Sequence, residues 1–207
     1  MSIPYMTFSW GGVLAALGFG YLLGSIPFGL LFAYAFGEGD VRKIGSGTIG
    51  ATNVLRTGNR TAAALTLLFD AVKGAAAVAF VREIVGPDAA LLAGLGAFLG
   101  HLYPAWLNFK GGKGVAVSLG VLLTVFWPGA LLAAATWLAV VAWSRISSLS
   151  ALVAAVMAPL YMLMFDRLHE ALLTFVLAVL VFVAHRQNIR RLLNGEEPRI
   201  GNTSKPG

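Results

Sequence analysis

The strongest constraint in this 207-residue sequence is a series of apolar runs separated by short polar segments. The runs cover residues 10–36, 60–85, 88–107, 114–127, 128–144, 148–165 and 170–185. Several of them approach the roughly 20 apolar residues that a helix needs to cross a bilayer. Only 12% of the residues are charged, whereas a soluble domain has about 25%. The pattern predicts an all-α integral membrane protein, with one domain over residues 1–207 and a flexible tail at about 202–207.

The runs at 114–127 and 128–144 leave the number of crossings open. The segment Trp127-Pro128-Gly129 between them has the composition of a turn. A turn there favours two short spans and seven transmembrane helices in all, whereas one long kinked helix would give six.

The basic residues predict an orientation. With seven spans and the N-terminus outside, twelve of the fifteen Lys and Arg residues fall on the inner side. These twelve are Arg42, Lys43, Arg56, Arg60, Lys110, Lys113, Arg145, Arg186, Arg190, Arg191, Arg199 and Lys205. Because basic loops stay in the cytoplasm, we expect the N-terminus outside and the C-terminus in the cytoplasm. The same rule accounts for the net charge of +6 without a nucleic acid as partner.

A first polar segment, residues 45–56, precedes the second apolar run. It offers hydroxyl, amide and guanidinium groups on a glycine-rich backbone, at Ser46, Thr52, Asn53 and Arg56. An Arg side chain is suited to a bidentate grip on phosphate. The alternative is a polar connection with an Asn or Thr helix cap.

A second polar segment, which we call the glycine loop, covers residues 110–114. Its sequence is Lys110-Gly111-Gly112-Lys113-Gly114. Glycine leaves backbone N–H groups uncovered, so that they can converge on an oxyanion, and each lysine adds a charge. A helix that begins near Gly114 would add its positive end. The loop does not fit the Walker A pattern, and the alternative is a flexible basic loop on the inner side.

A C-terminal polar segment, residues 185–197, follows the last apolar run. On a continuous helix, His185 and Asn188 would lie on one face at the membrane exit. The alternative is a basic segment that only ends the last span. Inside the spans, Asp70 and Lys73 stand three residues apart, and we expect them to pair with each other.

The sequence predicts neither a metal nor another cofactor. It contains no cysteine, which excludes disulfides and thiolate chemistry, and no His, Asp and Glu residues have the spacing of metal ligands. The basic segments instead indicate a phosphorylated compound at a membrane surface. A membrane transporter of phosphate or of an organic phosphate would need the same cations, so it is the alternative to an enzyme.

Taken together, the polar segments resemble the bacterial acyl-phosphate:glycerol-3-phosphate acyltransferases, the PlsY type. The matching stretches, in the order of the family, are Gly24–Gly29, Ser46–Arg56, Asp70–Gly74, Gly100–Pro104, Phe109–Val115 and His185–Glu196. Thr48 departs from the family, which usually has Asn there. The resemblance implies seven spans and the transfer of a fatty acyl group from acyl phosphate to the 1-hydroxyl of glycerol 3-phosphate. The product would be lysophosphatidic acid.

The resemblance also implies where the site lies and which residues form it. The catalytic residues would be Ser46, Arg56, His185 and Asn188. The substrate- and phosphate-binding residues would be Thr52, Asn53, Lys110, Gly111, Gly112, Lys113, Gly114 and Glu196. His185 would act either as a base or only to orient a substrate. The site would face the cytoplasm from the inner membrane, in contact with membrane lipid and with the enzyme that forms acyl phosphate.

Overall fold

The computed structural model describes residues 10–201, and every regular element in that range is a helix. The predicted tail at 202–207 lies outside the described residues. The chain divides into two compact units, one ending at Val125 and the other beginning at Phe126. We describe each unit by itself, and the single domain over the whole chain stays a prediction.

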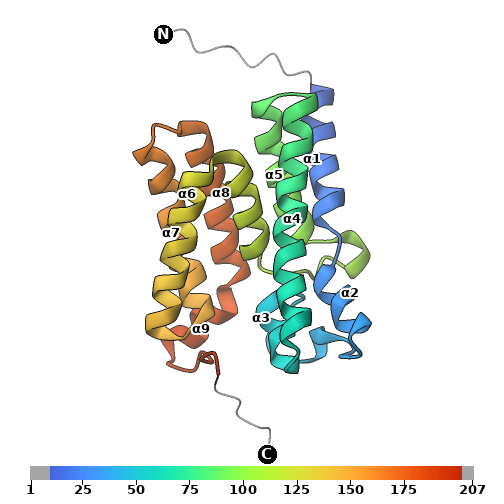
Figure 1. Cartoon of the computed structure of the whole chain (residues 1–207), viewed down its shortest axis with the longest axis vertical. Helices are drawn as coiled ribbons and strands as arrows, with labels where there is room; N and C mark the ends of the chain where they lie inside the picture. The colour runs from blue at the N-terminus through green and yellow to red at the C-terminus, as the bar shows by residue number, and fades with distance from the viewer. Residues whose placement is uncertain (1–9, 202–207) are drawn as a thin grey trace, which may run out of the picture. The chain divides into compact units, whose positions relative to one another are not determined.

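The first unit is built on α1 (Trp10–Gly24), α4 (Arg60–Ile84) and α5 (Pro87–Leu102), which pack against one another in pairs (Figure 1). Small residues let the backbones approach closely. A Cβ atom on Gly24 would lie 2.0 Å from the carbonyl oxygen of Ala97, which excludes any side chain there. Such contacts are typical of helices packed in a membrane.

The first apolar run is one candidate span with a break in it. After α1 the chain leaves the helix at Ser25 and Ile26, and α2 (Phe28–Ala35) begins after Pro27. The segment between α2 and α4 contains three short helices, η1 (Val41–Lys43), α3 (Ala51–Val54) and η2 (Leu55–Thr57). A fourth short helix, η3 (Ala105–Leu107), follows α5. Asn59 then caps α4, because its side chain accepts a hydrogen bond from the N–H of Ala62.

The element α6 (Val115–Ser144) is interrupted at Phe126, whose backbone is extended at φ −157° and ψ 91°. Pro128 lies two residues later and cannot donate a helical hydrogen bond. The interruption lies beside the predicted turn at residues 127–129, so the run is not one regular helix. Among residues 10–201, five helices are long and apolar enough to cross a membrane, or six with one bent pair. The predictions of seven crossings and of an outer N-terminus therefore stay predictions.

The second unit contains α7 (Ser147–Met164), α8 (Leu168–Ala184) and α9 (Arg186–Leu193), and all three contact one another. The helix axis bends by 64° between α8 and α9. His185 and Asn188 therefore do not lie on one continuous helix: α8 ends at Ala184, and α9 begins after His185.

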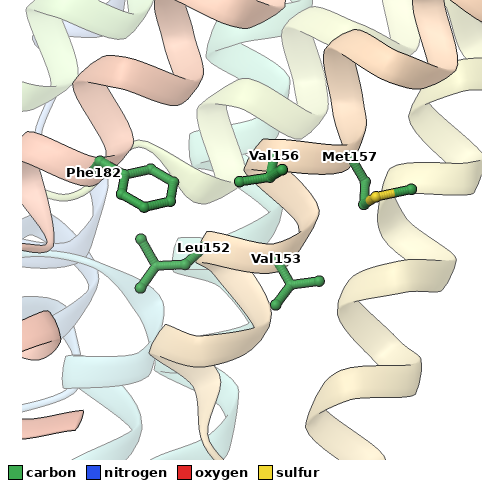
Figure 2. Close-up of a pocket in the computed structure, with 5 residues that line it drawn as sticks. All are labelled: Leu152, Val153, Val156, Met157 and Phe182. Atoms are coloured by element: carbon green, nitrogen blue, oxygen red, sulfur yellow. The ribbon is translucent and has the colours of Figure 1, made fainter. Parts of the chain in front are cut away.

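A small apolar pocket lies between α7 and α8 (Figure 2). Its volume is about 220 Å³, and it is lined by Leu152, Val153, Val156, Met157 and Phe182. Large apolar side chains also cover the outside of the helices; Trp143, for example, is 85% exposed. Apolar outer surfaces of this kind suit a lipid environment.

Candidate active site

Asn53 holds the first polar segment together. Its side chain is only 2% exposed. The Nδ2 group donates to the carbonyl oxygens of Val41, at 2.7 Å, and Thr48, at 2.8 Å. The Oδ1 atom accepts from the N–H of Ser46 at 3.0 Å and from Nη1 of Arg56 at 3.3 Å. Because the whole amide is used within the segment and by Val41 just before it, Asn53 positions the segment.

The hydroxyl groups of Ser46 and Thr48 lie 3.0 Å apart and share a hydrogen bond. Thr48, the residue that departs from the family pattern, therefore contacts one of the predicted catalytic residues. Gly45 precedes them at φ +54°, and a Cβ there would lie 2.4 Å from Oδ1 of Asn53. Thr52 and Arg56 lie on the exposed side of the segment.

The backbone of the glycine loop turns toward α5. The N–H groups of Gly111 and Gly112 donate to the carbonyl oxygens of Leu102 and His101, each at 3.0 Å. The N–H of Lys110 donates to the carbonyl oxygen of Leu107 at 3.1 Å. The sequence suggested that N–H groups of this loop converge on an anion. These three groups instead donate to separate carbonyl oxygens of the chain. Anion binding by this loop would instead fall to its lysine side chains and to its last residues.

The glycines of the loop are required by close packing. A Cβ on Gly112 would lie 2.0 Å from Nε2 of His101, and a Cβ on Gly114 would lie 2.1 Å from the ring of Phe98. Gly114 also has φ +82°, which favours glycine. The helix α6 begins at the next residue, Val115. The positive end of a helix therefore lies beside the loop, as predicted.

Asp70 and Lys73 form the predicted ion pair, with 2.6 Å between Oδ1 and Nζ. His101 joins the pair, because its Nδ1 atom lies 3.0 Å from Nζ of Lys73. Sequence reasoning missed the contact of His101 with Lys73. The only signal was that both residues lie in apolar runs, where polar side chains need partners.

His185 is buried where α8 ends, and its Nδ1 atom lies 2.8 Å from the carbonyl oxygen of Val181. A carbonyl oxygen can only accept, so Nδ1 carries the proton and, in the neutral ring, Nε2 carries the lone pair. His185 therefore presents a hydrogen-bond acceptor, which can orient a hydroxyl group or receive its proton.

Asn188 is 3% exposed, and its Nδ2 group donates to Oε1 of Glu197. A carboxylate only accepts, which fixes the orientation of the amide. The opposite atom, Oδ1, is buried and accepts no hydrogen bond from the residues that the structure describes. A buried acceptor of this kind is costly unless something donates to it. Oδ1 of Asn188 is therefore a buried acceptor that a donor would satisfy.

Glu197 is the centre of the polar contacts in the second unit. Besides Asn188, it accepts from Oγ of Ser148 at 2.7 Å and from Nε of Arg191 at 2.6 Å. Burial alone would raise the pKa of Glu197, but these three hydrogen bonds outweigh it and hold the pKa below its ordinary value. The predicted residue, Glu196, is exposed, and its carboxylate accepts a hydrogen bond from Nδ2 of Asn194 at 3.3 Å. Nothing in the sequence distinguishes these two neighbouring glutamates.

Within residues 10–201, no three His, Cys, Asp or Glu side chains are grouped as metal ligands. The described residues thus offer cations, amides and hydroxyls for a site. The prediction that the protein needs no metal stays a prediction.

The sequence matches a known protein family, described as glycerol-3-phosphate acyltransferase, over residues 14–195. The chain belongs to the glycerol-3-phosphate acyltransferase family. The matched region contains the first polar segment, the glycine loop and nearly all of the C-terminal polar segment.

Two members of the glycerol-3-phosphate acyltransferase family are closely similar to this chain. The protein of Cereibacter sphaeroides is 61% identical over 88% of this chain and 87% of its own length. The protein of Bradyrhizobium diazoefficiens is 58% identical over 90% of this chain and 94% of its own length.

Two crystal structures of PlsY, an integral membrane glycerol 3-phosphate acyltransferase, are also similar to this chain. Its glycerol 3-phosphate form has 38% identity and a TM-score of 0.86, covering 91% of this chain and 96% of that chain. Its lysophosphatidic acid form has 37% identity and a TM-score of 0.84, covering 91% and 95%. With these likenesses and its long apolar helices, this chain is an all-α integral membrane protein, as predicted.

Proposed function

We propose that this protein transfers a fatty acyl group from acyl phosphate to the 1-hydroxyl of glycerol 3-phosphate, giving lysophosphatidic acid and phosphate for phospholipid biosynthesis. One observation carries the proposal. The similar solved protein has a glycerol 3-phosphate form and a lysophosphatidic acid form, which correspond to an acceptor and a product of this transfer. Family membership favours this enzyme over a membrane transporter of phosphate.

The proposed reaction needs no covalent enzyme intermediate, because acyl phosphate is already activated. The hydroxyl oxygen of glycerol 3-phosphate forms a bond to the acyl carbon, and the bond from that carbon to the phosphate oxygen breaks. The hydroxyl proton passes to the departing phosphate. The enzyme must therefore hold two phosphates, orient one hydroxyl and stabilise the oxyanion on the acyl carbon.

The first unit would supply the contacts to phosphate. Arg56 and the two lysines of the glycine loop are the cations. The N-terminal end of α6 adds the positive end of a helix dipole. We assign Ser46 and Thr52 to direct contact with substrate, and Asn53 to holding their segment. The full set of residues in this unit that we propose to bind substrate or to shape the binding segments is Ser46, Thr52, Asn53, Arg56, Lys110, Gly111, Gly112, Lys113 and Gly114.

The second unit would supply acceptors for the substrate hydroxyl. Oδ1 of Asn188 is a buried acceptor with no described donor, and Nε2 of His185 carries a lone pair in the neutral ring. We propose that these two atoms accept hydrogen bonds from glycerol 3-phosphate. His185 then orients the hydroxyl, while the departing phosphate takes its proton. We keep Glu196 among the proposed binding residues, whereas Glu197 is engaged by Ser148 and Arg191 within the protein.

We propose the inner membrane as the location of this multi-pass protein, with the reaction on the cytoplasmic face. Glycerol 3-phosphate is a cytoplasmic metabolite, and twelve of the fifteen basic residues fall on that face in the predicted topology. Acyl phosphate and membrane lipid are the other partners, together with a contact to the enzyme that forms acyl phosphate.

The deciding experiment compares acyl donors. Purified protein is given glycerol 3-phosphate with acyl phosphate, with acyl-CoA or with acyl carrier protein. We expect transfer from acyl phosphate alone, because the His-x-x-x-x-Asp pattern of thioester-dependent glycerolipid acyltransferases is absent: the fifth residue after His101 is Trp106, and after His185 it is Arg190. Equal turnover with acyl-CoA would contradict the proposal. Transfer should also continue in EDTA, and a loss restored by magnesium would show that a metal takes part.

Single substitutions test the two cations. We expect Arg56→Ala and Lys113→Ala each to lose about 2–4 kcal/mol of transition-state stabilisation, as for a charged contact to a transferring group. Lys43→Ala is the matched control, since Lys43 is an exposed cation beside the same segment. A folded Arg56→Ala or Lys113→Ala protein with the kcat/KM of the control would remove that residue from the site.

A further inference from the structure

Three ionisable side chains are buried inside the first unit and have no part in the proposed reaction. Asp70 and Lys73 of α4 and His101 of α5 are exposed by only 1%, 3% and 3%. A charge inside a membrane span is expensive, and a buried ion pair adds little net stability over an apolar pair of the same size. A role in setting the geometry of nearby segments is therefore worth testing.

The ammonium group of Lys73 has as many acceptors as it has hydrogens. Nζ lies 2.6 Å from Oδ1 of Asp70, 2.7 Å from the carbonyl oxygen of Ile26 and 3.0 Å from Nδ1 of His101. With all three hydrogens donated, Nδ1 of His101 is an acceptor, and the ring carries its proton on Nε2. Lys73 thus fixes both the position and the tautomer of the ring.

His101 in turn contacts the glycine loop on two sides. Its carbonyl oxygen accepts from the N–H of Gly112 at 3.0 Å. Its ring packs on the same residue so closely that a Cβ on Gly112 would lie 2.0 Å from Nε2. The next hydrogen bond, from the N–H of Gly111 to the carbonyl oxygen of Leu102, extends this docking by one residue. Any shift of the ring would therefore displace the loop.

The same cluster reaches the break in the first span. Ile26, which accepts from Lys73, lies between α1 and α2, and the ring of Phe28 lies 5.6 Å from Nζ. Nε1 of Trp106 in η3 donates to the carbonyl oxygen of Ser25 at 2.9 Å. The break, α4 and the end of α5 are thus joined at one buried point.

We infer that Asp70, Lys73 and His101 are positioning residues that set the backbone of the glycine loop for phosphate binding. The effect of these residues on catalysis rests on the proposed function, whereas their role in positioning the glycine loop does not. None of the three needs to touch substrate.

The experiment compares His101→Leu, which removes the acceptor, with His101→Asn, whose Oδ1 can replace Nδ1. The double variant Asp70→Asn/Lys73→Met is a second test in case His101→Leu does not fold. It removes both charges of the pair and so leaves no unpaired buried charge. Thr66→Val is the matched control. Thr66 is equally buried on α4, but its hydroxyl bonds only to the carbonyl oxygen of Ala62 in its own helix.

Two quantities are measured in each purified protein. The first is kcat/KM for glycerol 3-phosphate with acyl phosphate as donor. The second is the mobility of a nitroxide on Lys110→Cys, recorded on separate labelled samples. The chain has no cysteine, so the label is unique.

We expect His101→Leu and the double variant to raise label mobility and to lower kcat/KM about tenfold or more, as for a lost charge-assisted hydrogen bond. His101→Asn should keep label mobility and kcat/KM close to those of the parent, and Thr66→Val should change neither quantity. Folded variants with the mobility of the parent and kcat/KM within about threefold of it would overturn the inference. If the parent itself transfers no acyl group, the proposed function fails, and label mobility alone still decides the positioning role.

Discussion

At the scale of single residues, Asn53 shows how one side chain organises a candidate site. The family resemblance marked it as a ligand for substrate, but its amide contacts Ser46, Thr48 and Arg56 of its own segment and Val41 just before it. Two of these partners, Ser46 and Arg56, are predicted catalytic residues. Their placement therefore depends on Asn53 whether or not substrate is bound.

We expect Asn53→Ala to destabilise the protein by roughly 1–3 kcal/mol and to lower kcat/KM about tenfold or more, because several buried hydrogen-bonding groups lose their partner. Thermal unfolding in detergent and initial rates measure the two effects. Thr124→Val is the control, since that hydroxyl bonds within its own helix to the carbonyl oxygen of Gly120. Wild-type activity in a folded Asn53→Ala protein would contradict a positioning role.

The carboxylate of Glu197 gives a prediction about pH. Its pKa is lower in the folded protein than the ordinary value of 4.5. Such a group stabilises the fold above its unfolded pKa, and this stabilisation is lost as the pH falls through the folded pKa. Glu197→Gln should therefore be less stable than the parent at neutral pH and lose less stability on acidification.

Thermal unfolding between neutral pH and about pH 3 measures this difference. Glu196→Gln is the matched control, because this carboxylate is adjacent in the sequence but exposed. Glu196→Gln should follow the parent curve. A Glu197→Gln curve parallel to that of the parent would remove Glu197 from the acid response.

At the scale of helices, glycine decides how closely α1 approaches α5. Gly24 lies where a Cβ would meet the carbonyl of Ala97 at 2.0 Å, whereas Gly18 on the same helix has no heavy atom within 4 Å of its Cβ position. The sequence showed that small residues are abundant but not which of them lie at the contact. The packing of α1 on α5 makes that distinction.

We expect Gly24→Ala to destabilise the first unit by about 1–3 kcal/mol, because the extra methyl group forces the two backbones apart. Gly18→Ala should be neutral or stabilising by up to about 1 kcal/mol, since alanine favours helix. Thermal unfolding of the two purified variants in one detergent tests the pair. Equal stabilities would contradict the close approach of α1 and α5.

Two helix interruptions differ in how far the sequence predicted them. A turn was expected at residues 127–129, because Pro128 and Gly129 mark one, and the break lies beside it at Phe126. The 64° bend between α8 and α9 was not expected, because His185 and its neighbours include no proline or glycine. Asn188 and Glu197 both follow this bend and contact each other, and Ser148 of α7, far away in the sequence, donates to the same carboxylate.

At the scale of the whole molecule, the charge distribution predicts which ends of the helices face the cytoplasm. Lys43 lies in the segment between α2 and α4, and Glu83 lies in the last turn of α4. Both side chains are exposed. The predicted topology places the first inside and the second outside.

Single cysteines test this topology. A cysteine at Lys43 should resist an impermeant thiol reagent in intact cells and react once the membrane is opened, whereas one at Glu83 should react in intact cells. The chain has no cysteine of its own, so the unsubstituted protein is the blank. Labelling of position 43 from outside would reverse the predicted orientation.

By itself the sequence determined the class of the protein, the apolar spans, the three polar segments and the family they resemble. These properties are local, because hydropathy, charge and motif order are written along the chain. The tertiary structure decided that Asn53 holds a segment, that Glu197 and not Glu196 is the buried hub, and that the N–H groups of Gly111 and Gly112 face α5. Hydrogen-bond partners depend on which distant segments meet, and a single sequence carries no direct record of those meetings.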